Sequence, residues 1–397
     1  MAVSKPTTKP RTTSSLTSSR TAPACPQPLR ASSASELLKL LATVPDPRSR
    51  RGIRHNLPGI LAVAIAAVLT GARSFAAIGQ WVADADPDLL AALGSGRKAS
   101  PSETAIRRAF ARLDAAALDT ILAAWMWTRT HVVDQRRVIA IDGKTIRGAR
   151  TRDATGATII AAPHLVAAYD HDSGTVLGQL AVTAKSNEIP AVRTLLAGFD
   201  LTDVTVTVDA MHTQTDTAKF IVEAGGDYVF TAKRNQPTLY EACKALPWQK
   251  VPARRVSTQG HGRRVTRTIK VVQAPPWIEF HGAVQIAQIR RTVTRKGKKT
   301  IEVVYLITSA DQPTAPPATL AAWVQGHWGI EDRVHWVRDV TYGEDGSQVR
   351  TGAAPRVMAT LRNLVISLLR LGGWTNIAEA LRHHAADGRR PLALLTS

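Results

Sequence analysis

The stretch VIAIDGKTIRGAR, residues 138–150, runs from an apolar, strand-like segment into Asp142 and then into a group of basic residues. A second apolar segment, VTVTVD at 204–209, ends in the same way at Asp209. In open α/β sheets ligands bind at the carboxyl ends of the strands, so two adjacent strand ends would bring both carboxylates together. Either aspartate alone could simply cap a turn or a helix. The matched pair favours a functional site.

The segments around these two strands predict a mixed α/β sheet with helices on its faces. Three strand-like runs come first, and the turn Asp172-Ser173-Gly174 predicts that the second and third form a hairpin. A helical segment from Glu188, the strand ending near Asp209, a second helical segment and a strand ending at Lys233 follow. This order of elements is that of a ribonuclease H-like core.

The rest of the chain divides by composition and periodicity. Residues 1–34 are basic and poor in apolar side chains, which predicts a disordered arm. Residues 35–130 have helical periodicity and predict an all-helical N-terminal domain; within it, Ser100, Pro101 and Glu103 resemble a helix start. Residues 131–397 are assigned to the catalytic domain, with a small antiparallel β insertion, free of helices, at about 235–311.

The charge of the chain points to a polyanionic partner. Its 397 residues carry 51 Lys and Arg against 31 Asp and Glu, a net charge of +20, and the pI is near 10.6. Nucleic acid or a membrane surface would fit such a balance. Two cysteines are too few for a disulfide framework and suit a reducing cytosol. No signal peptide is visible, and the longest apolar run, 57–69, is too short to span a membrane.

Two close carboxylates repel each other and need a cation between them, and oxygen ligands favour Mg²⁺ or Mn²⁺. A third ligand has to come from downstream, where the candidates are Glu331, Asp332, Asp339, Glu344 and Asp345. Helical spacing places Glu331 on one face with His327, His335 and Arg338. Taken in isolation, Glu331 fits an ordinary exposed glutamate better than a metal ligand. A Walker A loop is excluded because Val138 stands five residues before Gly143, and no HExxH zinc motif is present.

Six ordered motifs resemble bacterial insertion-sequence transposases of the ISAs type, in the DDE transposase superfamily. They are AIDGKTIRGA (140–149), VLGQLAVTAKSNEIPA (176–191), VTVDAMHTQ (206–214), GGDYVFTAKRNQPTL (225–239), HGRRVTR (261–267) and HWGIEDRVHWVRDVTYGED (327–345). The resemblance implies a ribonuclease H-like core and a triad of Asp142, Asp209 and Glu331 that holds two Mg²⁺ or Mn²⁺ ions. In the signature around the family's glutamate, His327 stands at the arginine position, Arg338 at the lysine position and Val324 at the tyrosine position.

The resemblance further implies an enzyme that cuts DNA at the ends of its element and transfers the 3′-OH ends to target DNA. Double-stranded DNA is the expected partner, a homodimer would pair two ends, and the expected location is the cytoplasm, on the nucleoid. The residues expected to contact DNA are Lys144, Arg147, Lys185, Lys233, Arg263, Arg264, His327 and Arg338. Two alternatives stay open: a catalytically idle DNA-binding protein, and a nuclease of the same fold that does not transpose.

Overall fold

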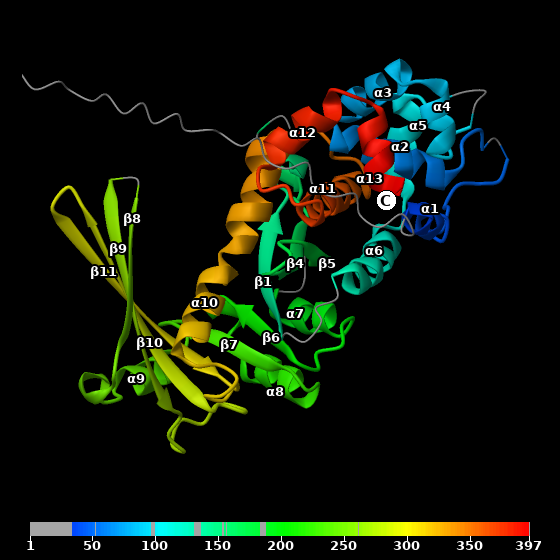
Figure 1. Ribbon diagram of the computed structural model, residues 1–397. Coiled ribbons are helices and arrows are strands. Elements are labelled where there is room, and N and C mark those ends of the chain that lie inside the picture. Colours follow the sequence, from blue (N-terminus) through cyan, green and yellow to red (C-terminus); the bar gives the residue numbers. More distant parts are fainter. Residues whose placement is uncertain are drawn as a thin grey trace, which may run out of the picture.

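The computed structural model describes residues 34–51, 53–96, 100–130, 136–152, 155, 157–182, 188–260 and 262–396. The arm predicted at 1–34 lies outside these residues apart from Ala34, where the first helix begins. Figure 1 shows helices gathered at one end of the molecule and a sheet with a long β-rich extension at the other. No helix in the described ranges is long and apolar enough to cross a membrane.

Five strands of the region predicted to be catalytic, which we call the catalytic sheet, lie in the order β5-β4-β1-β6-β7. They are β1 (Arg137–Thr145), β4 (His164–Asp170), β5 (Val176–Val182), β6 (Val204–Val208) and β7 (Asp227–Ala232). The first three pair antiparallel, while β6 and β7 continue parallel to β1. Helices α7 (Glu188–Leu196) and α8 (Thr215–Glu223) make the crossovers. This is the ribonuclease H-like topology, and the predicted order of elements is confirmed. A separate short hairpin of β2 (Thr151–Arg152) and β3 (Thr158–Ile160) was not predicted.

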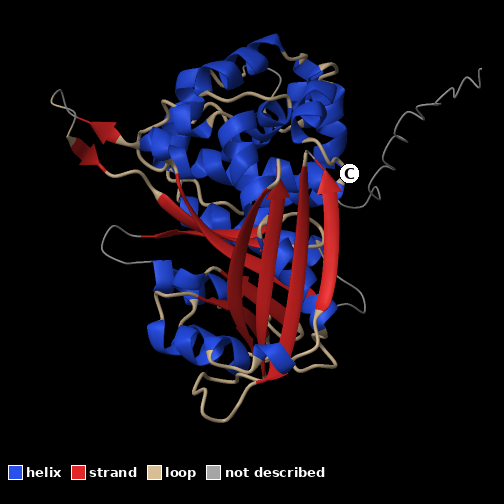
Figure 2. Ribbon diagram, turned by 90° about the vertical axis from the view of Figure 1, so that its left-hand side faces the viewer, coloured by secondary structure: helices blue, strands red, loops and turns tan. Residues whose placement is uncertain are grey.

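The predicted β insertion continues the catalytic sheet. Its strands are β8 (Arg254–Gly260), β9 (Arg263–Gln273), β10 (Gln285–Arg295) and β11 (Lys298–Thr308). Because β11 pairs antiparallel with β7, the described residues form one nine-stranded sheet, whose long outer strands are seen in Figure 2. From here on we call β8–β11 the arm; the name does not refer to residues 1–34. The expectation of no helix in this region was wrong, since α9 (Pro237–Lys244) starts with a proline in its first turn, a favourable helix start.

The helical unit is built from both ends of the chain. Its N-terminal helices are α1 (Ala34–Leu41), α2 (Leu57–Leu69), α3 (Phe75–Asp84), α4 (Pro87–Ala92), α5 (Glu103–Arg112) and α6 (Ala115–Arg129). Its C-terminal helices are α11 (Ala354–Leu371), α12 (Ile377–Ala385) and α13 (Arg389–Thr396). All share one apolar core. Helix α2 is apolar on every side and must be covered all round, and α11 and α13 supply part of that cover. A boundary at residue 130 therefore does not separate two independent cores.

One detail of the helical region differs from expectation. The N-cap of α5 is Ser102, whose side chain accepts a hydrogen bond from the Ala105 N–H, and not Ser100. Helix α5 stops at Arg112, and Asp114 caps the start of α6 by accepting from two backbone N–H groups. A side chain that can cap a new helix ends the preceding one as well.

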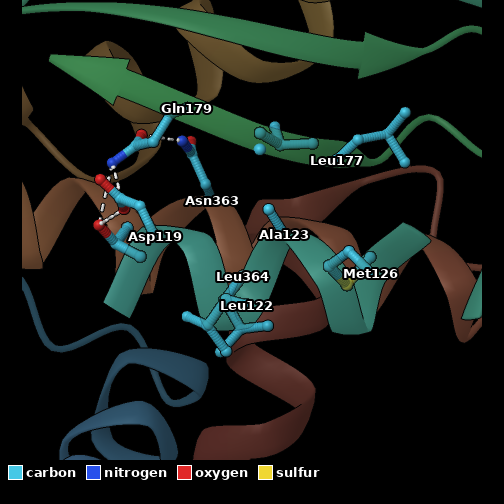
Figure 3. A pocket seen from close by; sticks show the side chains of 11 residues that line it. Asp119, Leu122, Ala123, Met126, Leu177, Gln179, Asn363 and Leu364 are labelled. Carbon is cyan, nitrogen blue, oxygen red and sulfur yellow. Dashed lines mark hydrogen bonds between the residues drawn. The ribbon is translucent and has the colours of Figure 1, made fainter. Parts of the chain in front are cut away.

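A buried polar network joins the helical unit to the catalytic sheet. Gln179 of β5 donates to Asp119 of α6 (3.0 Å) and to Thr360 of α11 (2.9 Å), while Asn363 of α11 donates to Gln179 (2.7 Å). Figure 3 shows these side chains around a small cavity, with Leu122 and other apolar side chains on its remaining wall. Because each buried polar group has a partner, the network fixes how α6 and α11 pack on β5.

Candidate active site

Asp142 and Asp209 lie side by side on the same face of the sheet. Ile141 of β1 and Val208 of β6 are partners in the parallel register, so the next residue of each strand is an aspartate. The apolar side chains before them point into the core beneath α7 and α8. Since side chains alternate along a strand, both aspartates point to the opposite face. Strand β1 does not end at Asp142 as expected, because its pairing with β4 continues to Thr145.

A long helix lies over that face and brings the third carboxylate. Helix α10 (Pro317–His327) contacts β1, β6 and β7 and continues into π-helical turns at Glu331–His335 and Val337–Thr341. Ile330 and Val334 pack on Ala140 and Tyr169 of the sheet. The close approach requires Gly329, because a Cβ there would lie 2.8 Å from the Tyr169 ring. Helix interruptions of the π type occur often at functional sites.

The two aspartates act on the third carboxylate, Glu331. Burial raises the pKa of Glu331, and the charges of Asp142, Asp332 and Asp209 raise it further. His335, one turn beyond Glu331, places Nδ1 3.4 Å from Oδ2 of Asp142. Burial is the larger cause of the raised pKa of Glu331, and the aspartate charges act in the same direction because they disfavour a further negative charge.

Basic groups adjoin the aspartates. Lys233, just after β7, places Nζ 3.0 Å from Oδ1 of Asp209. Although burial raises the pKa of Asp209, the hydrogen bond and charge of Lys233 help to bring it below its usual value. Nδ1 of His327 lies 3.0 Å from the Thr207 hydroxyl, and burial lowers the pKa of both His327 and His335, against the pull of nearby aspartates. Neutral imidazoles next to the carboxylates leave the site short of positive charge at neutral pH.

Two residues expected to contact DNA are instead committed to internal ion pairs. Arg338 is fully buried, and its Nη2 lies 2.7 Å from Oε1 of Glu344. Lys144 is 9% exposed, and its Nζ lies 2.6 Å from Oδ1 of Asp339. Arg338 therefore cannot reach a phosphate in this structure. The physical reason lies in the π turns at Glu331–His335 and Val337–Thr341, whose wider spacing accumulates along the helix: His335 still lies beside Asp142, but Arg338 no longer shares that face.

The other expected DNA contacts are placed as follows. Arg147 is exposed and lies 3.7 Å from Asp345, while Arg263 and Arg264 are exposed at the outer end of the arm. Lys185 lies outside the described residues. Sequence reasoning missed the partner of Lys144, Asp339, and a cluster of His164, Glu188 and His212 next to the two aspartates. Two members of that cluster stand inside the quoted motifs, but nothing in the motifs shows that they meet.

One face of the arm is rich in cations. Register places one set of arm side chains on the side of the sheet that α10 covers. The basic members of this set are Arg254, Arg263, Arg267, Arg291, Arg295 and Lys298. Three pairs of them stand directly opposite each other on neighbouring strands: Arg267 and Arg291, Arg263 and Arg295, and Arg295 and Lys298. Such pairs destabilise a sheet. Glu302, on the same face, stands opposite Arg291 and lies 3.6 Å from it, but the register places no acid opposite Arg263, Arg267, Arg295 or Lys298, so the face keeps an excess of positive charge.

The donor set suits a hard divalent cation. Among the residues described, no three His, Cys, Asp or Glu side chains are already gathered closely enough to enclose a metal ion. The donors that converge are carboxylates, which Mg²⁺ and Mn²⁺ prefer. The charges of Asp142 and Asp209 add to burial in raising the pKa of Glu331, and a cation between the carboxylates would offset this part of the shift. Asp142, Asp209 and Glu331 are therefore the residues that could hold such ions.

Comparison with known proteins identifies the family. The family model described as transposase DDE domain matches residues 134–368, and that of its associated region matches residues 38–126. The putative transposase YncI of Escherichia coli O157:H7 is 31% identical over 355 residues, 84% of this chain and 87% of that protein. The H repeat-associated putative transposase YhhI of Escherichia coli (strain K12) is 30% identical over 349 residues, 84% of this chain and 90% of that protein.

A structure of the piggyBac transposase synaptic complex with hairpin DNA gives a TM-score of 0.42 at 12% identity, covering 88% of this chain and 78% of that one, and so weak a likeness adds nothing further. The narrower assignment to the ISAs type stays a prediction. The family matches span the helical unit and the catalytic sheet together. The chain belongs to the family of bacterial transposases with a DDE domain.

Proposed function

We propose that this transposase cleaves phosphodiester bonds at the ends of its element and joins the freed 3′-OH ends to target DNA, using two Mg²⁺ or Mn²⁺ ions. The observation that carries the proposal is the placement of Asp142, Asp209 and Glu331 on one face of the sheet, close enough that both aspartates add to the effect of burial in raising the pKa of Glu331. Bound ions in such a site lower the pKa of water and neutralise charge on the leaving oxygen.

The protein's own residues then have separate tasks. Asp142 within β1 and Asp209 just after β6 would hold the ions from the sheet, and Glu331 would hold them from the helix above. Lys233 pairs with Asp209 at 3.0 Å. When DNA binds, its ammonium group could leave this carboxylate and pair with a phosphate oxygen instead. His335 keeps Asp142 in place by its contact with that carboxylate. Tyr169 and the part of the helix that packs on it lie beside the carboxylates and exclude water from this side of the site.

The arm is the second part of the proposed DNA-binding surface. Its cationic face lies on the same side of the sheet as the aspartates, and burial together with Arg291 and Arg263 lowers the pKa of Arg267. A phosphate backbone would relieve the repulsion between these side chains. Arg264, on the other face at the arm's outer end, and Arg147, beside the catalytic sheet, extend the basic surface. Two such chains in a synaptic dimer on the nucleoid would bring two element ends together.

The test is cleavage of a DNA fragment that carries the element's own ends, with and without Mg²⁺, by the wild type and by Glu331→Gln and Asp142→Asn variants. Loss of metal ligands removes several kcal/mol of transition-state stabilisation, so both variants should cut at least about a thousandfold more slowly. The matched control is Asp332→Asn, which removes an exposed carboxylate one residue away and should cut nearly normally.

Two outcomes would support the alternatives. End-specific binding by the wild type without cleavage at any Mg²⁺ or Mn²⁺ concentration would indicate the idle DNA-binding protein. Metal-dependent cleavage that ignores the end sequence would indicate a general nuclease of the same fold.

A further inference from the structure

A second group of ionisable side chains lies beneath the two aspartates, on the opposite face of the sheet. Glu188, the first residue of α7, places Oε1 2.7 Å from Nε2 of His164 on β4 and Oε2 3.2 Å from Nε2 of His212. Nδ1 of His164 lies 2.8 Å from the Thr145 hydroxyl at the end of β1. We call His164, Glu188, His212 and Thr145 the Glu188 cluster.

The cluster contacts the backbone that follows both aspartates. Gly143 comes directly after Asp142, and a Cβ there would lie 2.4 Å from Oε2 of Glu188 and 2.5 Å from Nε2 of His164. His212 is 2% exposed and ends the short 3-10 helix that begins after Asp209, where its backbone N–H donates to the Asp209 carbonyl (2.9 Å). One carboxylate therefore supports the segments that carry both predicted metal ligands.

The contacts of Glu188 are strong enough to fix geometry. The contact with His164, then that with His212, lowers the pKa of Glu188 to about 2, although burial opposes this. Charge-assisted contacts of this kind are shorter and stronger than neutral ones. Because alternate side chains point to opposite faces, the cluster lies on the α7 side and does not line the site that would receive DNA and metal.

We infer that Glu188 is a positioning residue that sets the spacing of Asp142 and Asp209 through His164 and His212. The inference rests on the proposed function, because spacing matters only if the aspartates share metal ions. Mutation of a residue that orients a metal ligand without touching the metal typically lowers metal affinity about 10- to 100-fold. Glu188 would act in this way without touching the metal or the DNA.

The experiment measures Mn²⁺ affinity of the full chain by the electron paramagnetic resonance signal of free Mn²⁺. Glu188→Gln keeps the shape of the side chain and removes its charge, and should raise the Mn²⁺ Kd about 10- to 100-fold. Affinity for element-end DNA without metal should stay at the wild-type value. The control Glu223→Gln removes an acid at the exposed end of α8 and should leave the Mn²⁺ Kd unchanged.

Glu188→Asp is the second variant, since it keeps the charge and folds even if the glutamine variant does not. Its shorter side chain cannot reach both histidines, so it too should bind Mn²⁺ more weakly. Wild-type Mn²⁺ affinity in both variants would overturn the inference, as would an equal loss of metal-free DNA binding, which indicates general distortion. Absence of Mn²⁺ binding by the wild type would instead refute the metal step of the proposed function, and the inference with it.

Discussion

Replacement of Arg338 by glutamine separates a structural role for this residue from a role in DNA binding. In the structure Arg338 donates from Nε to both oxygens of Glu344, each at 3.0 Å, and from Nη2 to Oε1 at 2.7 Å. Arg362 donates to the other oxygen at 2.8 Å. All three side chains are buried, so the ion cluster is shielded from solvent and salt.

The size of the effect follows from the same cluster. Burial alone would raise the pKa of Glu344, yet Arg338 and Arg362 lower it from 4.5 to about 2. A pKa difference of this size corresponds to about 3 kcal/mol of net stabilisation of the carboxylate. Removal of one partner from a buried ion pair typically costs about 3–5 kcal/mol. Since Arg362 remains, we expect Arg338→Gln to lower the free energy of unfolding by about 3 kcal/mol.

Urea unfolding followed by tryptophan fluorescence measures this loss, and salt-dependent binding to element-end DNA measures the alternative. The control Arg147→Gln removes an arginine whose side chain is 74% exposed and should change stability by less than about 0.5 kcal/mol. If Arg147 contacts a phosphate, its loss reduces the salt slope of binding by about 1. If Arg338→Gln unfolds at the same urea concentration as the wild type and itself reduces the salt slope of DNA binding by about 1, the structural role of Arg338 is refuted.

Two further predictions concern the arm and acid stability. Arg267→Gln removes the like charge opposite Arg291, so the arm should gain about 0.2–1 kcal/mol by thermal unfolding, while DNA affinity falls and the salt slope decreases by about 1. A stability gain without weaker DNA binding would exclude this face as a DNA contact. The lowered pKa of Glu344 predicts that its stabilisation is fully present above pH 4.5 and is lost as the pH falls toward 2. Circular dichroism between pH 5 and pH 2 should therefore show destabilisation that Glu344→Gln lacks.

The catalytic sheet could be predicted from sequence because its strands are short, apolar and separated by clear helix and turn signals. The neighbouring positions of Asp142 and Asp209 follow from the same pattern, because each comes directly after the apolar residues of one of two adjacent parallel strands, although β1 itself continues past Asp142. The pairing of β11 with β7 could not be predicted, because the two strands are about seventy residues apart and their pattern does not encode partners. The sequence therefore predicts the arm only as a small antiparallel insertion, whereas in the structure it extends the catalytic sheet.

The errors in the helical parts have a different origin. Helical periodicity assumes a constant number of residues per turn, and the π turns after Glu331 break that assumption, so Arg338 was placed on the wrong face. The shared core of N- and C-terminal helices was missed because an amphipathic pattern shows that a helix buries a face but not what covers it. The contacts of Glu188 could not be predicted for the same reason, because its partners come from β4 and from the segment after β6.

The continuity of the sheet connects the carboxylates with the cations of the arm. Four strand spacings separate β6 from β9 in the order β6-β7-β11-β10-β9, or roughly 19 Å at about 4.8 Å per spacing. Adjacent strands rotate by about 20–25°, so the arm is turned by roughly a right angle relative to the strands that carry Asp142 and Asp209. Because the strand pairing is continuous, the cations of the arm and the two aspartates stay on the same side of the twisted sheet. Helix α10 contacts β1, β6 and β7 as well as β9 of the arm, so under the proposed function a DNA backbone on the arm would reach the carboxylates along one side of this helix.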